Sequence, residues 1–180
     1  MTKEQFLSTV TEPIRAVALA NNIPFEFMMS QIALETGWGT SSLFFEHWNV
    51  GGIKAYGTVA STLCWTWENV KTDDLPKYEN RNKAKDKDIG KDKMGNQLTA
   101  IYLQLPFASF DNLTDGINYY LRYVLMNSYF KHYIAECGGD AIKYVNLLQS
   151  GGVSGKEPKY ATDINYISKI TLLINQFKNK

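Results

Sequence analysis

Apolar side chains in this chain recur with a helical period at both ends and alternate by two in between. The first helical pattern covers residues 6–18, behind a Thr2 that can cap the helix. Pro13 is expected to kink or divide this helix. A second helix is predicted to start at Pro24 and to stop at Gly37, because proline suits a first helical turn and glycine a C-terminal cap.

Between the two helical parts, residues 63–68 follow the alternation of a strand. That spacing puts Trp65 and Trp67 on one face and Glu68 on the other. We expect the tryptophans to point into the core, so that Glu68 need not follow them there. Residues 101–107 alternate again, which predicts a return strand paired with the first.

The connection between these strands, about residues 71–99, is expected to be an insertion within a small sheet. Residues 71–93 hold eight Lys or Arg and six Asp or Glu, a net charge of +2, and few large apolar side chains. Such a composition is typical of a solvated loop or mobile segment.

Helical spacing resumes in the last third of the chain. One helix is expected from residue 113, after a cap at Asp111 or Asn112, and another from Asp140 to the glycines at 151 and 152. Asp163 can cap a last helix. Its inward positions are predicted to be Ile167, Ile170, Ile174 and Phe177. Together the elements predict an α+β fold in which helix dominates.

Length and charge narrow the class of protein. The 180 residues, 44% of them hydrophobic, are enough for the core of one domain. A net charge of +1 argues against nucleic acid as a partner. No apolar run approaches the roughly 20 residues that cross a bilayer, so no membrane insertion is expected, and residues 1–10 lack the features of a signal peptide. Cys64 and Cys137 are predicted to be free thiols.

Glu35 is the first candidate for chemistry. It is placed at the C-terminal end of a predicted helix, where the helix dipole disfavours a negative charge. Trp38 and Phe44 are close in sequence and would add desolvation, which also raises the pKa of a carboxyl group. A carboxyl group that stays protonated near neutral pH can donate a proton to a leaving glycosidic oxygen. The alternative is an ordinary surface residue in the last turn of a helix.

Glu68 supplies a second carboxylate, and glycosidases commonly use two. Without that context, Glu68 is expected to be an ordinary solvated residue on the polar face of a strand. His47 and His132 lack neighbours at metal-ligand spacing, so neither a metal nor a cofactor is expected. The chain is rich in aromatic residues, with 11 Tyr, 9 Phe and 4 Trp. Most of these belong in the core, but Tyr160 and Tyr166 could either line a sugar cleft or pack the start of the last helix.

Four segments in order resemble the bacterial endo-β-N-acetylglucosaminidases of glycoside hydrolase family seventy-three, which are peptidoglycan hydrolases. Residues 31–41, QIALETGWGTS, are similar to the helix and acid motif of that family. Residues 49–54, NVGGIK, resemble its Asn-Leu-Phe-Gly-Ile-Lys turn. Residues 66–68, TWE, resemble its Thr-x-Glu, and residues 160–166, YATDINY, its Tyr-Ala-Thr-Asp-Pro-x-Tyr.

The resemblance implies a lysozyme-like fold, with a predominantly helical lobe and a small β-hairpin lobe at about residues 49–110. Residues 1–180 would form a single catalytic domain that cleaves the β-1,4 bond between N-acetylglucosamine and N-acetylmuramic acid. Glu35 carries over as the general acid, and Glu68 as a base, a nucleophile or a helper of the substrate's own N-acetyl group. The substrate-binding residues it implies are Gln31, Trp38, Asn49, Gly52, Tyr160 and Tyr166.

The expected partner is the peptidoglycan glycan strand, bound by a monomer acting at the bacterial cell wall, as a phage lysin or an autolysin domain does. Val50 and Gly51 stand where the family has Leu-Phe, and Ile164 stands where it has Pro. Two alternatives stay open at this point. One is a muramidase or lytic transglycosylase of the same fold, and the other is a non-catalytic wall-binding module.

Overall fold

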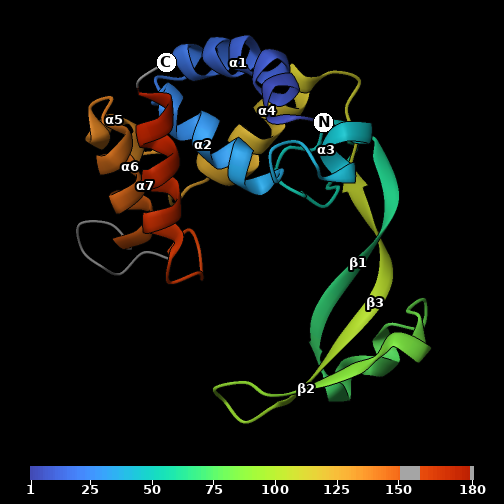
Figure 1. Ribbon diagram of the computed structural model, residues 1–180. Helices are drawn as coiled ribbons and strands as arrows, with labels where there is room; N and C mark the ends of the chain where they lie inside the picture. The colour runs from blue at the N-terminus through green and yellow to red at the C-terminus, as the bar shows by residue number, and fades with distance from the viewer. Residues whose placement is uncertain (151–158, 179–180) are drawn as a thin grey trace. The chain divides into compact units, whose positions relative to one another are not determined.

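A computed structural model describes residues 1–150 and 159–178, so the predicted helix end at residues 151 and 152 lies outside the described residues. Figure 1 shows the elements. The α-helices are α1 (Lys3–Ala20), α2 (Phe25–Glu35), α3 (Ser42–His47), α4 (Leu113–Tyr120), α5 (Tyr133–Cys137), α6 (Ala141–Ser150) and α7 (Tyr166–Phe177). The strands are β1 (Ser61–Lys71), β2 (Lys87–Lys91) and β3 (Gln97–Ala108). Shorter turns of helix are η1 (Thr72–Lys77), η2 (Lys83–Lys85) and η3 (Leu121–Leu125).

The chain forms two compact units. A helical unit comprises residues 1–53 together with the chain from residue 109 onward, and a sheet unit comprises residues 54–108. Each unit has its own packing. Among the described residues, no helix is long and apolar enough to span a membrane. Both cysteines are free thiols, as predicted.

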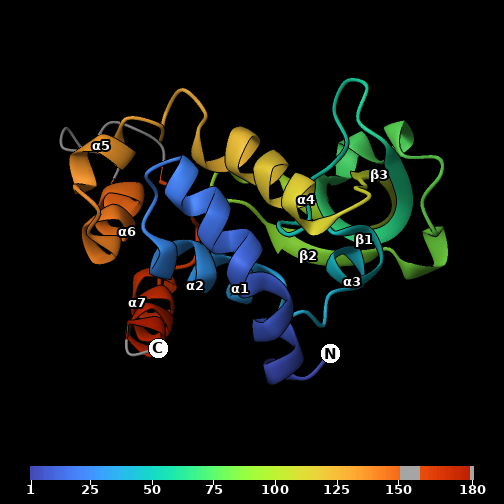
Figure 2. The same cartoon turned by 90° about the horizontal axis from the view of Figure 1, so that it is seen from above.

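The helical unit starts with the predicted capping box. Thr2 Oγ1 accepts a hydrogen bond from the Gln5 amide, and the Gln5 side chain accepts one from the Thr2 amide. Pro13 lies inside an unbroken α1, so the expectation that it divides the helix is wrong. Helix α4 lies beside α1 (Figure 2), and Asn112 is its N-cap.

Helix α2 is the centre of this unit. It packs against α1, α6 and α7, and its residues 27–33 are all buried. Because neighbours cover α2 on several sides, its hydrophobic residues do not form a one-sided stripe. The contacts with α1, α6 and α7 therefore fix the position of the last turn of α2.

The start of α7 differs from the expectation. Asn165, not Asp163, is its N-cap, and Ile167 is exposed rather than inward. Tyr166, Ile170, Ile174 and Phe177 form the buried stripe. Ile167 lies about 100° around the helix from Tyr166, which turns it away from the core.

In the sheet unit, β1 and β3 pair antiparallel as predicted, and β2 adds to the other edge of β3. Trp65 and Trp67 do lie on one face of β1 and Glu68 on the other, as predicted. The covered face, however, is the one with Glu68 and not the one with the tryptophans. Trp65 and Trp67 are 47% and 44% exposed. Glu68 pairs with Ile101, which is fully buried. Alternation defines two faces of a strand, and the apolar side chains of the paired strand decide which one is covered.

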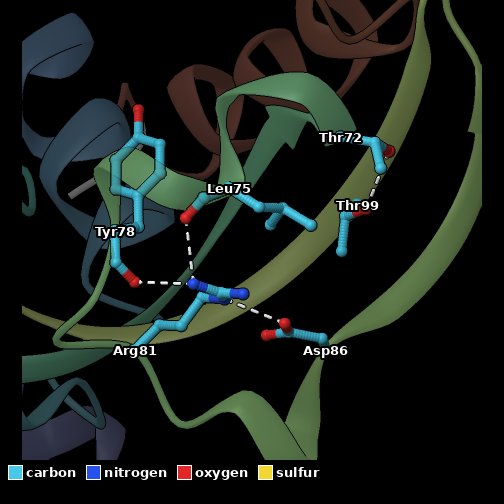
Figure 3. A network of polar contacts seen from close by, with 6 residues as sticks. All are labelled: Thr72, Leu75, Tyr78, Arg81, Asp86 and Thr99. Carbon is cyan, nitrogen blue, oxygen red and sulfur yellow. Dashed lines mark hydrogen bonds and ion pairs between the residues drawn. The ribbon is translucent and has the colours of Figure 1, made fainter.

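The charged connection is ordered, which corrects the expectation of a solvated or mobile segment. It contains η1, η2 and the third strand, and Figure 3 shows the polar contacts that hold it. Arg81 binds Asp86 at 2.8 Å and donates to the carbonyl groups of Leu75 and Tyr78 at 2.9 Å. The Arg81 side chain is only 11% exposed, so a guanidinium group with several donors organises a segment that has little apolar material.

Candidate active site

Glu35 is the last residue of α2, and the backbone immediately after it forms a Schellman motif. The Trp38 amide donates to the Ala33 carbonyl at 2.8 Å, and the Gly37 amide donates to the Leu34 carbonyl at 3.2 Å. Gly37 has φ +56°, a conformation that costs glycine little. The predicted stop at Gly37 is confirmed, and it places Glu35 at the C-terminal end of a helix.

A buried amide connects Glu35 to two tyrosines. Gln31, one turn before Glu35 and fully buried, donates through Nε2 to Glu35 Oε1 at 2.8 Å and to the Tyr160 hydroxyl at 2.9 Å. Its Oε1 accepts a hydrogen bond from the Tyr166 hydroxyl at 2.7 Å. Since Tyr166 can only donate to the oxygen, it fixes the orientation of the amide and aims the nitrogen at Glu35.

Tyr120 extends this network, and the sequence did not single it out. Its hydroxyl lies 2.7 Å from that of Tyr160. Tyr160 accepts from Gln31 and directs its own proton to Glu35, which leaves Tyr120 as the donor to Tyr160. A Tyr at a core position of a helical stripe carries no local sign that its hydroxyl meets a partner 40 residues away.

Gly51 is shaped to fit Tyr120. A Cβ at position 51 would lie 2.5 Å from Cδ2 of the Tyr120 ring, far inside van der Waals contact. The absence of a side chain at Gly51, where the related family has Phe, therefore leaves the room that the Tyr120 ring occupies. Gly51 thus makes room for Tyr120, whose hydroxyl belongs to the hydrogen-bond network of Glu35.

The surroundings of Glu35 favour its protonated form. Burial raises the pKa of the Glu35 carboxyl, and the hydrogen bonds from Gln31 and Tyr160 lower it by less. Glu35 as a residue remains exposed, so the desolvation is partial. Burial also raises the pKa of Tyr160 and Tyr120 above the usual range, so both stay neutral hydroxyls. Phe44, which the sequence suggested as a source of desolvation, packs against Phe6.

Glu35 opens onto a pocket of about 580 Å³. Tyr160, Tyr166 and Phe130 give it aromatic walls, and Asn127 and the ion pair of Asp163 with Lys169, 2.6 Å apart, give it polar groups. The pocket thus combines one carboxyl group, aromatic rings and a few polar groups, which is the usual make-up of a small-molecule or sugar site. Tyr123, Asn127 and Lys169 also line it, and no motif in the sequence pointed to these three.

Three of the predicted binding residues have other surroundings. Trp38 packs against Phe6 and lines a different pocket, of about 340 Å³. Asn49 is buried, and its side chain bonds both the amide and the carbonyl of Ile53 at 2.9 Å, which closes the turn. Gly52 has φ +59° and open space at its Cβ position.

Glu68 belongs to the sheet unit, on β1. Its Oε1 lies 2.9 Å from Lys54 Nζ, and the two side chains are 32% and 41% exposed. Lys54 forms an isolated bridge with Phe107 on β3, which holds it beside the strand pair. The described residues contain no group of three His, Cys, Asp or Glu side chains that could hold a metal ion.

Comparisons with known proteins cover nearly the whole chain. The model of the glucosaminidase family, described as mannosyl-glycoprotein endo-beta-N-acetylglucosaminidase, matches residues 11–179. The peptidoglycan hydrolase FlgJ of Salmonella typhimurium is 23% identical over 180 residues, which are 97% of this chain and 46% of that protein. The chain therefore spans about half the length of the curated relatives it matches.

Solved structures agree on the fold. The catalytic domain of the autolysin Auto from Listeria monocytogenes superposes with a TM-score of 0.67 at 19% identity, covering 98% of this chain and 84% of that one. The glycoside hydrolase domain of Salmonella typhimurium FlgJ gives 0.63 at 20% identity, covering 99% and 90%. These similarities confirm the predicted lysozyme-like α+β fold.

Proposed function

The chain belongs to the glucosaminidase family of glycoside hydrolases, and on that premise we propose that it hydrolyses the glycan strands of bacterial peptidoglycan. The bond it would cleave is the β-1,4 bond that leaves N-acetylglucosamine at the new reducing end. The substrate is supported by the names of its relatives, a peptidoglycan hydrolase and an autolysin. The observation that carries the proposal is Glu35, a partly desolvated carboxyl group hydrogen-bonded to neutral partners at the edge of a pocket.

In this mechanism Glu35 is the general acid. Gln31 occupies Oε1, which leaves the other carboxyl oxygen to carry the proton. As the glycosidic bond breaks, that proton passes to the leaving oxygen, and water later adds to the sugar carbon left behind. A raised pKa keeps Glu35 protonated at a higher pH than an ordinary glutamate.

Gln31, Tyr166 and Asn49 would act by positioning. All polar groups of the Gln31 amide are directed to Glu35, Tyr160 and Tyr166, and the Asn49 amide is used by its own turn. We propose that Tyr160, whose hydroxyl reaches Glu35, contacts the sugar or orients the intermediate. Trp38 and Gly52 stay predicted binding residues.

Glu68 is the proposed second carboxylate. Its pairing with Lys54 holds a negative charge at one place on a strand, which suits a base, a nucleophile or a group that assists the N-acetyl oxygen of the substrate. The site of action would be the bacterial cell wall, and the protein would work as a monomer.

Product analysis tests the proposal. Purified peptidoglycan is digested by the wild type, by Glu35→Gln, and by Glu26→Gln as a control at the other end of the same helix. The fragments are reduced with borohydride and identified by mass spectrometry. Reduced N-acetylglucosamine ends from wild type and control, and almost none from Glu35→Gln, are expected.

Other products would point elsewhere. Reduced or anhydro muramic acid ends would make the protein a muramidase or a lytic transglycosylase. Binding to the wall with no released fragment would make it a non-catalytic module. Equal digestion by Glu35→Gln and wild type would exclude Glu35 as the acid.

A further inference from the structure

One face of the sheet carries three neighbouring aromatic rings, Trp65, Trp67 and Tyr102, which we call the aromatic face. Trp65 stacks on Tyr102 with the ring centroids 5.0 Å apart and the planes 15° from parallel. Trp67 lies 5.1 Å from the same ring. The two tryptophans are almost half exposed. Indole rings that are grouped and open to solvent mark a binding surface more often than single exposed residues do.

Packing of the sheet does not account for these rings. In the β1–β3 register, Trp67 pairs with Tyr102 and Glu68 with Ile101, so successive residues of β1 alternate between the two faces. The covered face is the one with Glu68, Ile101 and Leu103. The aromatic face is therefore the reverse side of the strand that carries the candidate second carboxylate.

Two lysines give the aromatic face a positive charge. Lys85 Nζ lies 4.1 Å above the Tyr102 ring, and Lys87 Nζ lies 4.9 Å from the Trp67 ring. Among the described residues, neither ammonium group forms an ion pair with a carboxylate. Within the described residues no lysine or arginine lies over the Trp65 ring, and this side chain is 47% exposed.

Amide side chains share this surface. Gln104 pairs with Trp65 across the strands, and Asn69 lies two residues beyond Trp67 on β1. Amides can donate to and accept from the hydroxyl and acetamido groups of a sugar. This surface therefore combines three kinds of group. Aromatic rings suit the apolar faces of pyranoses, amides suit the polar edges of the sugars, and cations suit carboxylates.

We propose that the aromatic face is a second glycan-binding site, which takes an anionic peptidoglycan strand through its sugar rings and the carboxylates of its stem peptides. The inference rests on the proposed function, because that function supplies the polymer. The site would hold insoluble wall material independently of the pocket at Glu35.

The size of the face argues against a protein partner. A large aromatic side chain buries about 150–250 Å² when fully covered, so three partly exposed rings offer roughly 300 Å². A stable protein interface needs about 800 Å² from each partner. The amides at Gln104 and Asn69 argue against a lipid surface, where they would be buried without partners.

The experiment measures retention on insoluble peptidoglycan that has been stripped of protein and of other wall polymers. All variants carry Glu35→Gln, so that the probe is not digested. Trp65→Ala with Trp67→Ala is expected to lower retention about tenfold. Phe45→Ala is the matched control, because Phe45 is 60% exposed on α3 and should bind as the parent does. Melting curves verify that each variant is folded.

A second pair of variants tests the charge. Lys85→Gln with Lys87→Gln should weaken retention at low salt and flatten its dependence on salt concentration. In the active background, the tryptophan variants should lose more activity on insoluble walls than on short soluble glycan fragments. Retention equal to the parent in both pairs would overturn the inference.

Other results would reassign the surface. Tryptophan-dependent binding to phosphatidylglycerol vesicles would make it a membrane contact, and a tryptophan-dependent dimer in sedimentation would make it an interface between copies. Failure of the proposed function gives a different result, because then the wild type releases no fragment with a reducing N-acetylglucosamine end from any substrate.

Discussion

The two candidate carboxylates, Glu35 in the helical unit and Glu68 in the sheet unit, have opposite surroundings. Glu35 receives hydrogen bonds from an uncharged amide and an uncharged phenol, and burial raises its pKa. Glu68 lies 2.9 Å from the ammonium group of Lys54 on a half-exposed strand. Burial and uncharged partners surround one carboxyl group, whereas an ammonium group pairs with the other.

The two environments also differ in how the fold builds them. The hydrogen-bond network around Glu35 comes from α2, α4, the segment before α7 and the start of α7, with Tyr160 and Tyr166 separated from Gln31 by 129 and 135 residues. Glu68 depends on one nearby lysine and a strand pairing. The acid is thus tied to the whole helical core, whereas the sheet carboxylate depends on local structure. Disturbing either should have different consequences.

The largest effect is expected from removing the two carboxylates one at a time. Glu35→Gln should lower the rate of wall hydrolysis by about 10³-fold or more, because it removes the proton donor. Glu68→Gln should lower it by a smaller factor, on the order of 10²-fold. The measurement is release of soluble fragments from purified walls. A greater loss for Glu68→Gln would reverse the assigned roles.

A smaller effect is expected from two buried hydroxyls. Tyr120→Phe removes the donor to Tyr160 and should cost about 1 kcal/mol of unfolding free energy, together with a several-fold loss of activity. Tyr144 provides the matched control, because its buried hydroxyl has no hydrogen-bond partner within the described chain. Tyr144→Phe should leave stability unchanged or raise it. Urea unfolding measures the free energy of unfolding of both variants. Equal losses would show that the Tyr120 hydroxyl contributes no more to stability than the Tyr144 hydroxyl does.

Much of the helical unit could be predicted from the sequence. The capping box at Thr2, the stop at Gly37 and the cap at Asn112 are local signals, and each matches the structure. Glu35 could be found because its position at a helix end is itself local. Tyr120 could not, because its role depends on a hydroxyl 40 residues away and on the space left by Gly51.

The sheet unit was harder to predict for a physical reason. Alternation assigned Trp65 and Glu68 to opposite faces correctly but could not decide which face is covered, since that depends on the paired strand. The composition of residues 71–93 suggested a loop because charged side chains rarely form a core. Arg81 nevertheless holds this segment through partners five and six residues away, and β2 pairs with β3; composition reveals neither contact.

The smallest expected effect concerns stability rather than activity, and it separates the two carboxylates most clearly. A pKa of Glu35 that is raised on folding means that the folded protein holds this proton more tightly than the unfolded chain does. The stability this contributes is complete below the ordinary pKa of a glutamate, about 4.3, and is lost as the pH rises through the higher pKa of the folded state. Glu35→Gln, which cannot ionise, should therefore melt above the wild type at pH 7 by less than about 4 °C, because the group is exposed. The difference should vanish near pH 4.

Glu68→Gln should show no such gain at neutral pH, since it breaks the pairing with Lys54. Thermal unfolding from pH 4 to pH 8 measures both, and a Glu35→Gln variant that melts below the wild type at pH 7 would contradict the assignment of a partly desolvated acid.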